Sequence, residues 1–281
     1  MVRDRGGQGL PPRHLLRGAR GSATPVTLHP ELKNLRAEYL LRLGDNALIL
    51  SQRLCEWCGH APTLEEDLAL SNVALDLLGQ ARLWLDAAGR GLTPAQSEDD
   101  LAYGRDAQAF RNVLLVELTR GNFADTQMRQ FLFDSWHCLL LRELSDSADA
   151  EVAAIAAKAL KEATYHLRRS SGWVVRLGDG SRQSREFCRL ALERCWHYVG
   201  ELFEMDELEQ AMLAQGVGCD LAALYPEWLA YVNEVLAAAT LEPPRAAPAV
   251  SGGKRGAHGE ALVALLMEMQ FLTRAHPGAG W

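Results

Sequence analysis

The chain has 281 residues, 48% of them hydrophobic, and its 29 Lys and Arg against 36 Asp and Glu give a formal net charge of −7. This composition excludes a largely disordered chain, and an acidic balance without Lys/Arg clusters argues against nucleic acid as a partner. No stretch approaches the roughly 18 uncharged apolar residues of a membrane span, so we expect a soluble, cytoplasmic protein with no membrane partner.

Residues 1–27 differ from the rest of the chain. They contain five Arg against a single Asp, together with five Gly and three Pro. This composition predicts a disordered tail, to which we assign no function. A transit peptide and a start codon placed too far upstream both stay open as its origin. Residues 28–281 are expected to form one helical domain, because no linker within them is long enough to separate two cores.

Apolar residues at helical spacing run through nearly all of this domain. In its first segment Leu43, Ala47 and Leu50 are three or four positions apart, which is typical of one face of a packed helix. Gly59–Pro62 ends this pattern, and Thr63–Glu66 then reads as a capping box that opens a second helix.

The same spacing continues to the C-terminus, whereas alternating β-branched and aromatic residues are missing. The sequence therefore predicts an all-α fold. The expected helices cover residues 31–57, 63–88, 101–117, 124–144, 149–177, 183–205, 221–239 and 260–275.

Two groups of residues have the composition of a binding motif. The six cysteines are expected to be reduced and buried, and the pair Cys55 and Cys58 lacks the second pair of a zinc site. The loop 251–256 is rich in glycine and carries Lys254 and Arg255, which are candidate phosphate-binding residues. Since the order of a P-loop is not met, an ordered loop before the last helix is the favoured interpretation.

Long helices raise the question of a dimetal site, because ferritin-type bundles bind two irons through two Glu and two Glu-x-x-His motifs. No histidine here is preceded three positions earlier by Glu, and the nearest substitute is Asp134 before His137. Glu162 stands four positions before His166. We therefore interpret Asp134, His137 and His166 as hydrogen-bonded interior groups, with metal ligation as the alternative. No catalytic residue is assigned.

Eight separated segments together resemble the C subunit of the bacterial phenylacetyl-CoA epoxidases, also called ring-1,2-phenylacetyl-CoA monooxygenases. The resemblance covers about residues 35–281, and Gly259 departs from the Thr expected after His258. The segments are Leu43–Asn46, Glu56–Pro62, Leu75–Arg82, Gly121–Thr126, Lys161–Arg168, Gly252–His258, Glu268–Gln270 and Pro277–Trp281.

This resemblance implies a ferritin-like four-helix bundle with extra C-terminal helices. It also implies a structural protein that pairs with the related catalytic A subunit of the epoxidase in aerobic phenylacetate degradation. A further small subunit and a flavin/iron-sulfur reductase complete the expected complex. The di-iron centre is expected in the catalytic A subunit, and no cofactor in this chain.

Aligning the metal-binding motifs of the catalytic A subunit with this chain explains why no cofactor is expected here. The second-helix Glu and His fall on Leu77 and Gln80, and the fourth-helix Glu falls on Ala163, so these ligand positions are lost. Residual ligand-type positions are His166 and, on the third helix, Asp134. The first-helix Glu falls near Ala47.

Three alternatives stay open. The chain could be a metal-dependent oxygenase in its own right that uses Asp134, His137, Glu162 and His166. It could be a coenzyme A-binding helical module whose Lys254 and Arg255 meet the phosphates. It could also be a free-standing helical scaffold.

Overall fold

The computed structural model describes residues 30–244 and 249–279, with side chains from residue 34 onward. The tail expected at residues 1–27 lies outside the described residues. Within the described ranges the chain consists of α-helices, short 3-10 turns and loops, without a strand. The all-α prediction is therefore confirmed. None of the helices in these ranges is long and apolar enough to cross a membrane.

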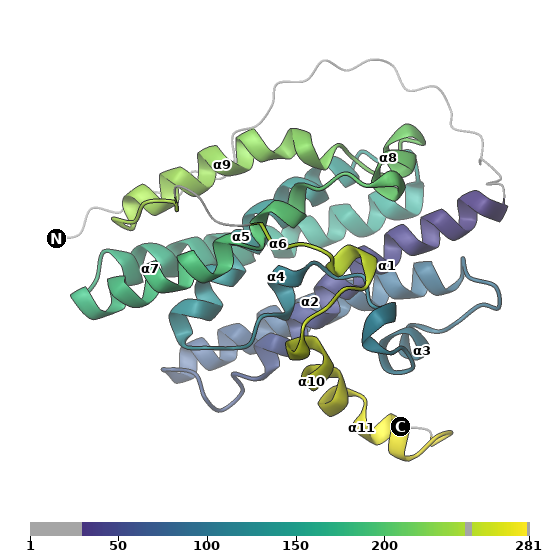
Figure 1. Cartoon of the computed structure of the whole chain (residues 1–281), viewed down its shortest axis with the longest axis horizontal. Helices are drawn as coiled ribbons and strands as arrows, with labels where there is room; N and C mark the ends of the chain where they lie inside the picture. The colour runs from purple at the N-terminus through teal and green to yellow at the C-terminus, as the bar shows by residue number, and fades with distance from the viewer. Residues whose placement is uncertain (1–29, 245–248, 280–281) are drawn as a thin grey trace.

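Four long helices form two antiparallel hairpins that pack as a bundle (Figure 1). The first hairpin is α1 (Pro30–Cys55) with α2 (Leu64–Gly89), and the second is α5 (Phe123–Leu144) with α6 (Ala150–Gly178). A long crossover joins α2 to α5, whereas each hairpin has a short loop. Two hairpins joined by one long crossover are the ferritin-like topology, which confirms the expected fold.

The remaining helices lie around this bundle (Figure 1). The crossover contains α3 (Glu98–Tyr103) and α4 (Leu114–Glu117). A 3-10 turn at Ala107–Ala109 separates these two helices. The C-terminal part contains α7 (Arg182–Trp196), α8 (Glu207–Ala214), α9 (Leu221–Ala238), α10 (Glu260–Met269) and α11 (Phe271–Ala275), with 3-10 turns at Val199–Phe203 and Gly253–Arg255.

Helix α5 is enclosed, because α6, α7 and α9 all pack against it. Most of its polar residues are consequently buried together with its apolar ones. Helix α6, by contrast, keeps a polar outer face and buries one stripe. The enclosure of α5 places Arg129, Gln130, Asp134 and His137 inside the protein.

Local interactions explain where the first hairpin turns. The Thr63 hydroxyl accepts a hydrogen bond from the Glu66 amide at 3.3 Å, as expected for an N-cap. The Glu66 carboxylate does not complete a capping box, since it pairs with Arg169 of α6 instead. Gly44 allows α1 and α2 to approach closely, because a Cβ there would lie 2.7 Å from Leu85 Cδ2.

Three expected helices are wrong in extent. The segment 101–117 is two short helices around a 3-10 turn, because Arg105, the Arg111 amide and the Val113 amide all bond to side chains of α1. The segment 183–205 leaves the α-helix at Trp196. The segment 260–275 breaks at Gln270, whose buried amide donates to two carbonyls of the crossover. Helix α8 was not expected.

The cysteines divide into two groups. All six are free thiols, and Cys138, Cys188 and Cys195 are buried as expected. Burial raises the pKa of the Cys188 thiol to about 11, which keeps it protonated at neutral pH. Cys219 is partly buried. The expectation of burial is wrong for Cys55 and Cys58, which are exposed where α1 ends.

The C-terminal segment is attached to the crossover through a buried carboxylate. Glu117 Oε2 lies 2.8 Å from His258 Nδ1, and Glu117 Oε1 accepts from the Gly259 amide at 2.9 Å. The second ring nitrogen of His258 donates to the Phe110 carbonyl at 3.0 Å. Burial disfavours the charged ring, but these acceptors outweigh it and raise the pKa of His258. The imidazolium therefore links α10 to the crossover.

Replacing His258 by Gln should lower the free energy of unfolding by about 2 kcal/mol at pH 6, since it removes a hydrogen bond between charged groups. A histidine with a raised pKa stabilises the fold fully below its ordinary value of about 6.5, and this contribution disappears as the pH rises through the folded-state pKa. Urea unfolding of both proteins at pH 6 and pH 9 measures the difference. A gap that grows toward pH 9 would contradict the assignment.

Candidate functional site

The polar groups singled out from sequence meet between α2, α5 and α6. Asp134 of α5 is fully buried, and its two carboxylate oxygens accept from Gln130 Nε2 at 2.7 Å and from Ser170 Oγ at 2.8 Å. Burial raises the pKa of Asp134 to about 6, and the nearby His166 ring opposes that rise. The interior interpretation of Asp134 fits this geometry, because both oxygens are occupied by donors of the same chain.

Helices α2 and α6 are joined by two polar pairs one helical turn apart. His166 Nε2 donates to Asp76 Oδ2 at 3.0 Å, and Gln80 Nε2 donates to Glu162 Oε2 at 2.9 Å. The residues at i and i+4 of each helix thus face the neighbouring helix. A cavity of about 110 Å³ lies beside these pairs, well below the roughly 300–1,000 Å³ of typical ligand sites. The pairs connect the two helices, and the cavity beside them is smaller than a typical ligand site.

His137 lies on α5 with its ring tilted against Phe133, at 5.0 Å between ring centroids. Its Nδ1 has no hydrogen-bond partner among the described residues. Burial, with a smaller contribution from His166, lowers the pKa of His137 to about 3. His137 is therefore a neutral ring at physiological pH.

A dimetal centre needs about four carboxylates and two imidazoles that converge, and the side chains here do not supply them. Leu77 and Ala163, at which the resemblance implies ligands of the catalytic subunit, are apolar and buried in the core, as is Ala47, near which it implies another. Gln80 offers an amide that is already bonded to Glu162. Within residues 34–244 and 249–279, no group of three or more His, Cys, Asp and Glu side chains is placed to hold a metal ion. The donor set does not fit a di-iron centre.

The residues proposed for the alternative metal-dependent oxygenase each bond to a different side chain. Asp134 bonds to Gln130 and Ser170, Glu162 to Gln80, and His166 to Asp76. The structure brings these residues to one region but, among the side chains it describes, does not join them in one ligand cluster.

The glycine-rich loop does cradle an anion, and that anion belongs to the chain itself. Glu201 Oε1 accepts from the Gly252 amide at 2.9 Å and from the Lys254 amide at 3.3 Å. The Lys254 ammonium is buried and donates to the Glu204 carbonyl at 3.1 Å. Arg255 is exposed, 3.5 Å from a Glu204 oxygen. This occupation favours the ordered-loop interpretation over a phosphate site.

Several residues of this region were missed by the sequence analysis. Gln130 and Ser170 hold Asp134, and Asp76 holds His166. The available signal was the placement of polar residues inside the apolar pattern of 124–144, which is typical of a helix enclosed by its neighbours.

Comparisons with known proteins identify the family. The sequence model of a family described as "Phenylacetic acid catabolic protein" matches residues 26–281. The chain belongs to this family. A relative from Escherichia coli strain K12, named as the C subunit of 1,2-phenylacetyl-CoA epoxidase, is 49% identical over 248 residues, which are 88% of this chain and the whole of the relative.

Membership in the phenylacetic acid catabolic protein family confirms the resemblance found in the eight sequence segments. The match extends over the four bundle helices and the C-terminal helices alike, because the family model covers residues 26–281. This member of the family has the bundle with buried apolar residues at Leu77 and Ala163, and among its described side chains no group of three or more His, Cys, Asp and Glu is placed to hold a metal ion.

Proposed function

We propose that this chain is the non-catalytic structural component of a multicomponent phenylacetyl-CoA 1,2-epoxidase and pairs with its di-iron catalytic A subunit. The observation that carries the proposal is the interior of the bundle, where Leu77 and Ala163 are buried apolar residues and the Gln80 amide is bonded to Glu162. The resemblance to the epoxidase subunits implies metal ligands of the catalytic subunit at these three positions. The relative's designation as the C subunit supports an epoxidase of several subunits. A small subunit and a flavin/iron-sulfur reductase would complete it.

The role of such a component is positional. The partner would bind the metal and the thioester, whereas this chain would bury one face of the partner's bundle and restrict the movement of its helices. A displacement of catalytic groups by about 1 Å can cost about a hundredfold in rate, so a rigid brace has a direct effect on turnover. The contact area expected for a permanent complex is roughly 2,000 Å² or more.

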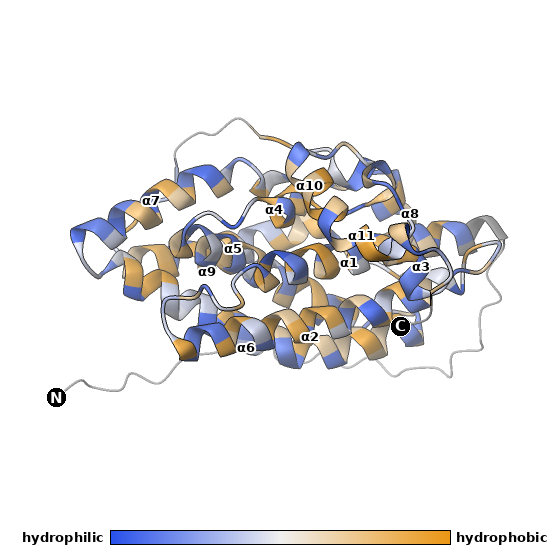
Figure 2. Cartoon of the chain, turned by 90° about the horizontal axis from the view of Figure 1, so that it is seen from below, coloured by the Kyte–Doolittle hydropathy of each residue, from blue (hydrophilic) through white to orange (hydrophobic). Residues whose placement is uncertain are grey.

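An exposed apolar stripe on α2 is the surface we assign to the partner. Leu64, Leu68 and Leu75 are 72%, 58% and 63% exposed and lie four and seven positions apart, hence on one helix face. Tyr165 of α6 is also exposed, and it lies at the level of Leu75 because its neighbour His166 bonds to Asp76. Figure 2 shows α2 and α6 side by side along one edge of the molecule. Large exposed apolar surfaces of this kind are typical of permanent interfaces.

The test is co-expression with a catalytic partner of the epoxidase, followed by size-exclusion chromatography and metal analysis of each fraction. We expect one complex whose iron follows the partner when the two chains are separated. Replacing Leu75 by Glu should weaken the complex at least tenfold, because a charge would be buried in an apolar contact.

Phe187 provides the matched control, since it is an exposed aromatic residue on α7 rather than on α2. Its replacement by Glu should leave the complex intact. Elution of the wild-type chain alone, or stoichiometric iron in the isolated chain, would refute the structural role. Equal weakening by both substitutions would refute the assignment to α2.

A further inference from the structure

The turn after α1 carries two free thiols on its solvent side. Cys55 is the last residue of α1, and Cys58 follows three positions later in the turn that leads to α2. Both residues are exposed, and the structural function proposed above uses neither of them. An accessible cysteine with a second cysteine close by is the usual arrangement of a thiol that is oxidised reversibly.

Trp57 fixes the direction in which the two cysteines face. Its side chain is buried, and its Nε1 donates to Thr126 Oγ1 of α5 at 2.9 Å. Its ring also packs edge-on against Phe123 of α5, at 5.7 Å between ring centroids. Because this anchor lies between Cys55 and Cys58 in the chain, both cysteines stay on the outer side of the turn.

The backbone of the turn brings the two thiols together. The Cys58 amide donates to the Cys55 carbonyl at 3.0 Å, a bond that spans three residues instead of four. In such 3-10 geometry the side chains at i and i+3 eclipse, whereas their Cβ atoms stay about 5–6 Å apart in an α-helix. A disulfide needs a Cβ separation of about 3.5–4.5 Å, so the tighter turn favours it.

Electrostatics also show that the two sulfurs are close. Partial burial raises the pKa of the Cys55 thiol, and the negative charge of the Cys58 thiolate raises it further. Two thiols that disfavour each other's ionisation lose this repulsion when they join in a neutral disulfide.

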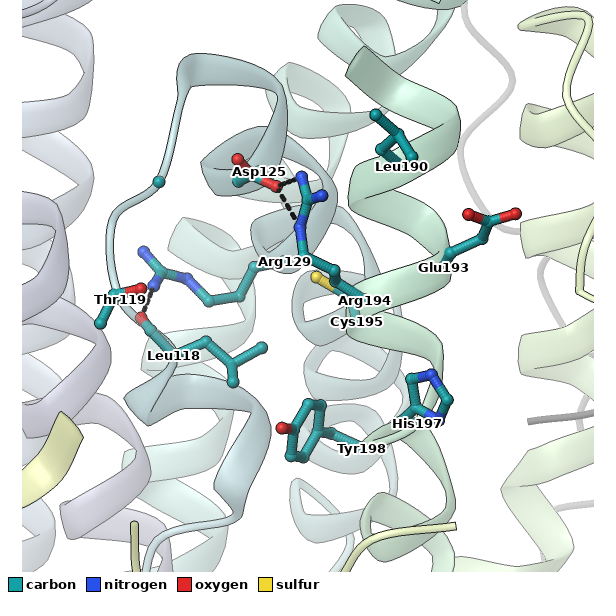
Figure 3. Close-up of a pocket in the computed structure, with 11 residues that line it drawn as sticks. Leu118, Thr119, Asp125, Arg129, Leu190, Glu193, Arg194, Cys195, His197 and Tyr198 are labelled. Carbon is teal, nitrogen blue, oxygen red and sulfur yellow. Dashed lines mark hydrogen bonds and ion pairs between the residues drawn. The ribbon is translucent and has the colours of Figure 1, made fainter. Parts of the chain in front are cut away.

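The other cysteines are poorly placed for the same chemistry. Cys138, Cys188 and Cys195 are buried, and Cys219 is partly buried. Figure 3 shows the Cys195 side chain on the inner side of α7, beside Arg129 of α5. Burial raises the pKa of Cys195 to about 12, so almost none of it is the reactive thiolate at neutral pH. Oxidation should therefore begin at the end of α1.

We propose that Cys55 and Cys58 form a reversible intramolecular disulfide by exchange with a low-molecular-weight disulfide such as oxidised glutathione. One cysteine thiolate attacks a sulfur of oxidised glutathione and releases one glutathione thiolate. The second cysteine gives its proton to water, attacks the mixed disulfide and releases the other glutathione. Two protein thiols are thus oxidised to one disulfide, while one small disulfide is reduced to two thiols.

This modification site lies where the first hairpin turns, and it goes beyond the structural function, since neither depends on the other. The Gly59 amide donates to Asp67 Oδ2 at 2.7 Å, which ties the turn to α2. A bond between Cys55 and Cys58 fastens the same turn to the end of α1. A disulfide at such an exposed position is easily reduced again, so it follows the thiol–disulfide balance of its surroundings.

The test is incubation of the reduced, folded full chain in a series of glutathione mixtures, from reduced to oxidised, followed by alkylation and peptide mass spectrometry. Trypsin cuts after Arg53 and Arg82 and at no site between them, so one peptide, residues 54–82, holds both cysteines. In oxidised mixtures we expect this peptide to lose two hydrogen atoms, to carry no glutathione, and to return to the dithiol with dithiothreitol.

Single variants separate this internal disulfide from simple glutathione addition. In Cys55→Ser and in Cys58→Ser the remaining thiol should keep bound glutathione, about ten times more than the wild-type peptide carries, because no second thiol displaces it. Cys219→Ser is the matched control and should oxidise at residues 54–82 as the wild type does. Circular dichroism verifies that each protein is folded during the incubation.

Three results would overturn the proposal. The first is a wild-type peptide that stays a dithiol throughout the series. The second is a wild-type peptide that ends with glutathione on either cysteine as its stable product. The third is an internal disulfide that forms only when urea has unfolded the chain.

Discussion

Replacing Asp45 by Asn lowers the free energy of unfolding by about 3–5 kcal/mol, the cost expected when one partner of a buried ion pair is removed. The Asp45 side chain of α1 is fully buried. Its carboxylate accepts from both terminal nitrogens of Arg105, one of them at 3.0 Å, and from the Arg111 amide at 2.8 Å. Asn keeps the size of the side chain but leaves the Arg105 guanidinium without a counter-charge. Urea unfolding followed by circular dichroism measures the loss.

The control for this prediction is the exposed pair of Arg189 and Glu186 on α7. Replacing Arg189 by Gln, which breaks this pair, should leave the urea midpoint unchanged, because surface ion pairs contribute little to stability. If Arg189→Gln and Asp45→Asn have similar effects, the crossover is not held by Asp45 in the way the structure indicates.

Replacing His137 by Leu makes the free energy of unfolding less sensitive to acid. The pKa of His137 is lowered to about 3 by burial, from an ordinary value of about 6.5. The unfolded state therefore binds a proton that the folded state rejects, and stability falls as the pH drops below about 6.5. At about 1.4 kcal/mol per unit of pH, the variant gains roughly 2 kcal/mol over the wild type at pH 5 compared with pH 8.

The measurement is a series of urea unfolding curves from pH 8 to pH 5. Asp134 changes stability in the opposite sense, because its pKa is raised to about 6 and its burial penalty is relieved as the pH falls toward 4. The comparison of variant with wild type cancels this contribution. Phe187, an exposed residue of α7 that does not titrate, supplies the control, and its replacement by Leu should leave the pH dependence unchanged. A His137→Leu curve parallel to the wild type would contradict the assignment.

The sequence was sufficient for the bundle because its signals are local. The apolar spacing predicts all four long helices within a few residues, and Thr63 correctly starts α2. It was insufficient for the crossover. Apolar residues keep helical spacing through residues 101–117, but the backbone there forms two short helices around a 3-10 turn. That backbone is bent by Asp45 and Asn46, some sixty residues away along the chain, so no local pattern could reveal it.

Part of the candidate site could also be predicted from the sequence, again because the signal is local. Leu77, Gln80 and Ala163 could be placed from the resemblance, since a motif fixes their spacing on a helix. The partners of Asp134 and His166 could not, because Ser170 and Asp76 are ordinary surface-type residues until two helices meet. Arg129 escaped notice because an arginine in a helix usually lies on the outside, and only the enclosure of α5 buries it.

The crossover is fastened to the rest of the protein chiefly by carboxylates that receive backbone amides. Asp45 accepts from Arg111, and Glu201 accepts from Leu114 and from Gly252 in the C-terminal part. A single loosening event at Glu201 would thus release two stretches of chain that are more than a hundred residues apart in sequence. We expect amide hydrogen exchange at Leu114 and Gly252 to proceed at matched rates, as one cooperative unit that opens before the long helices do.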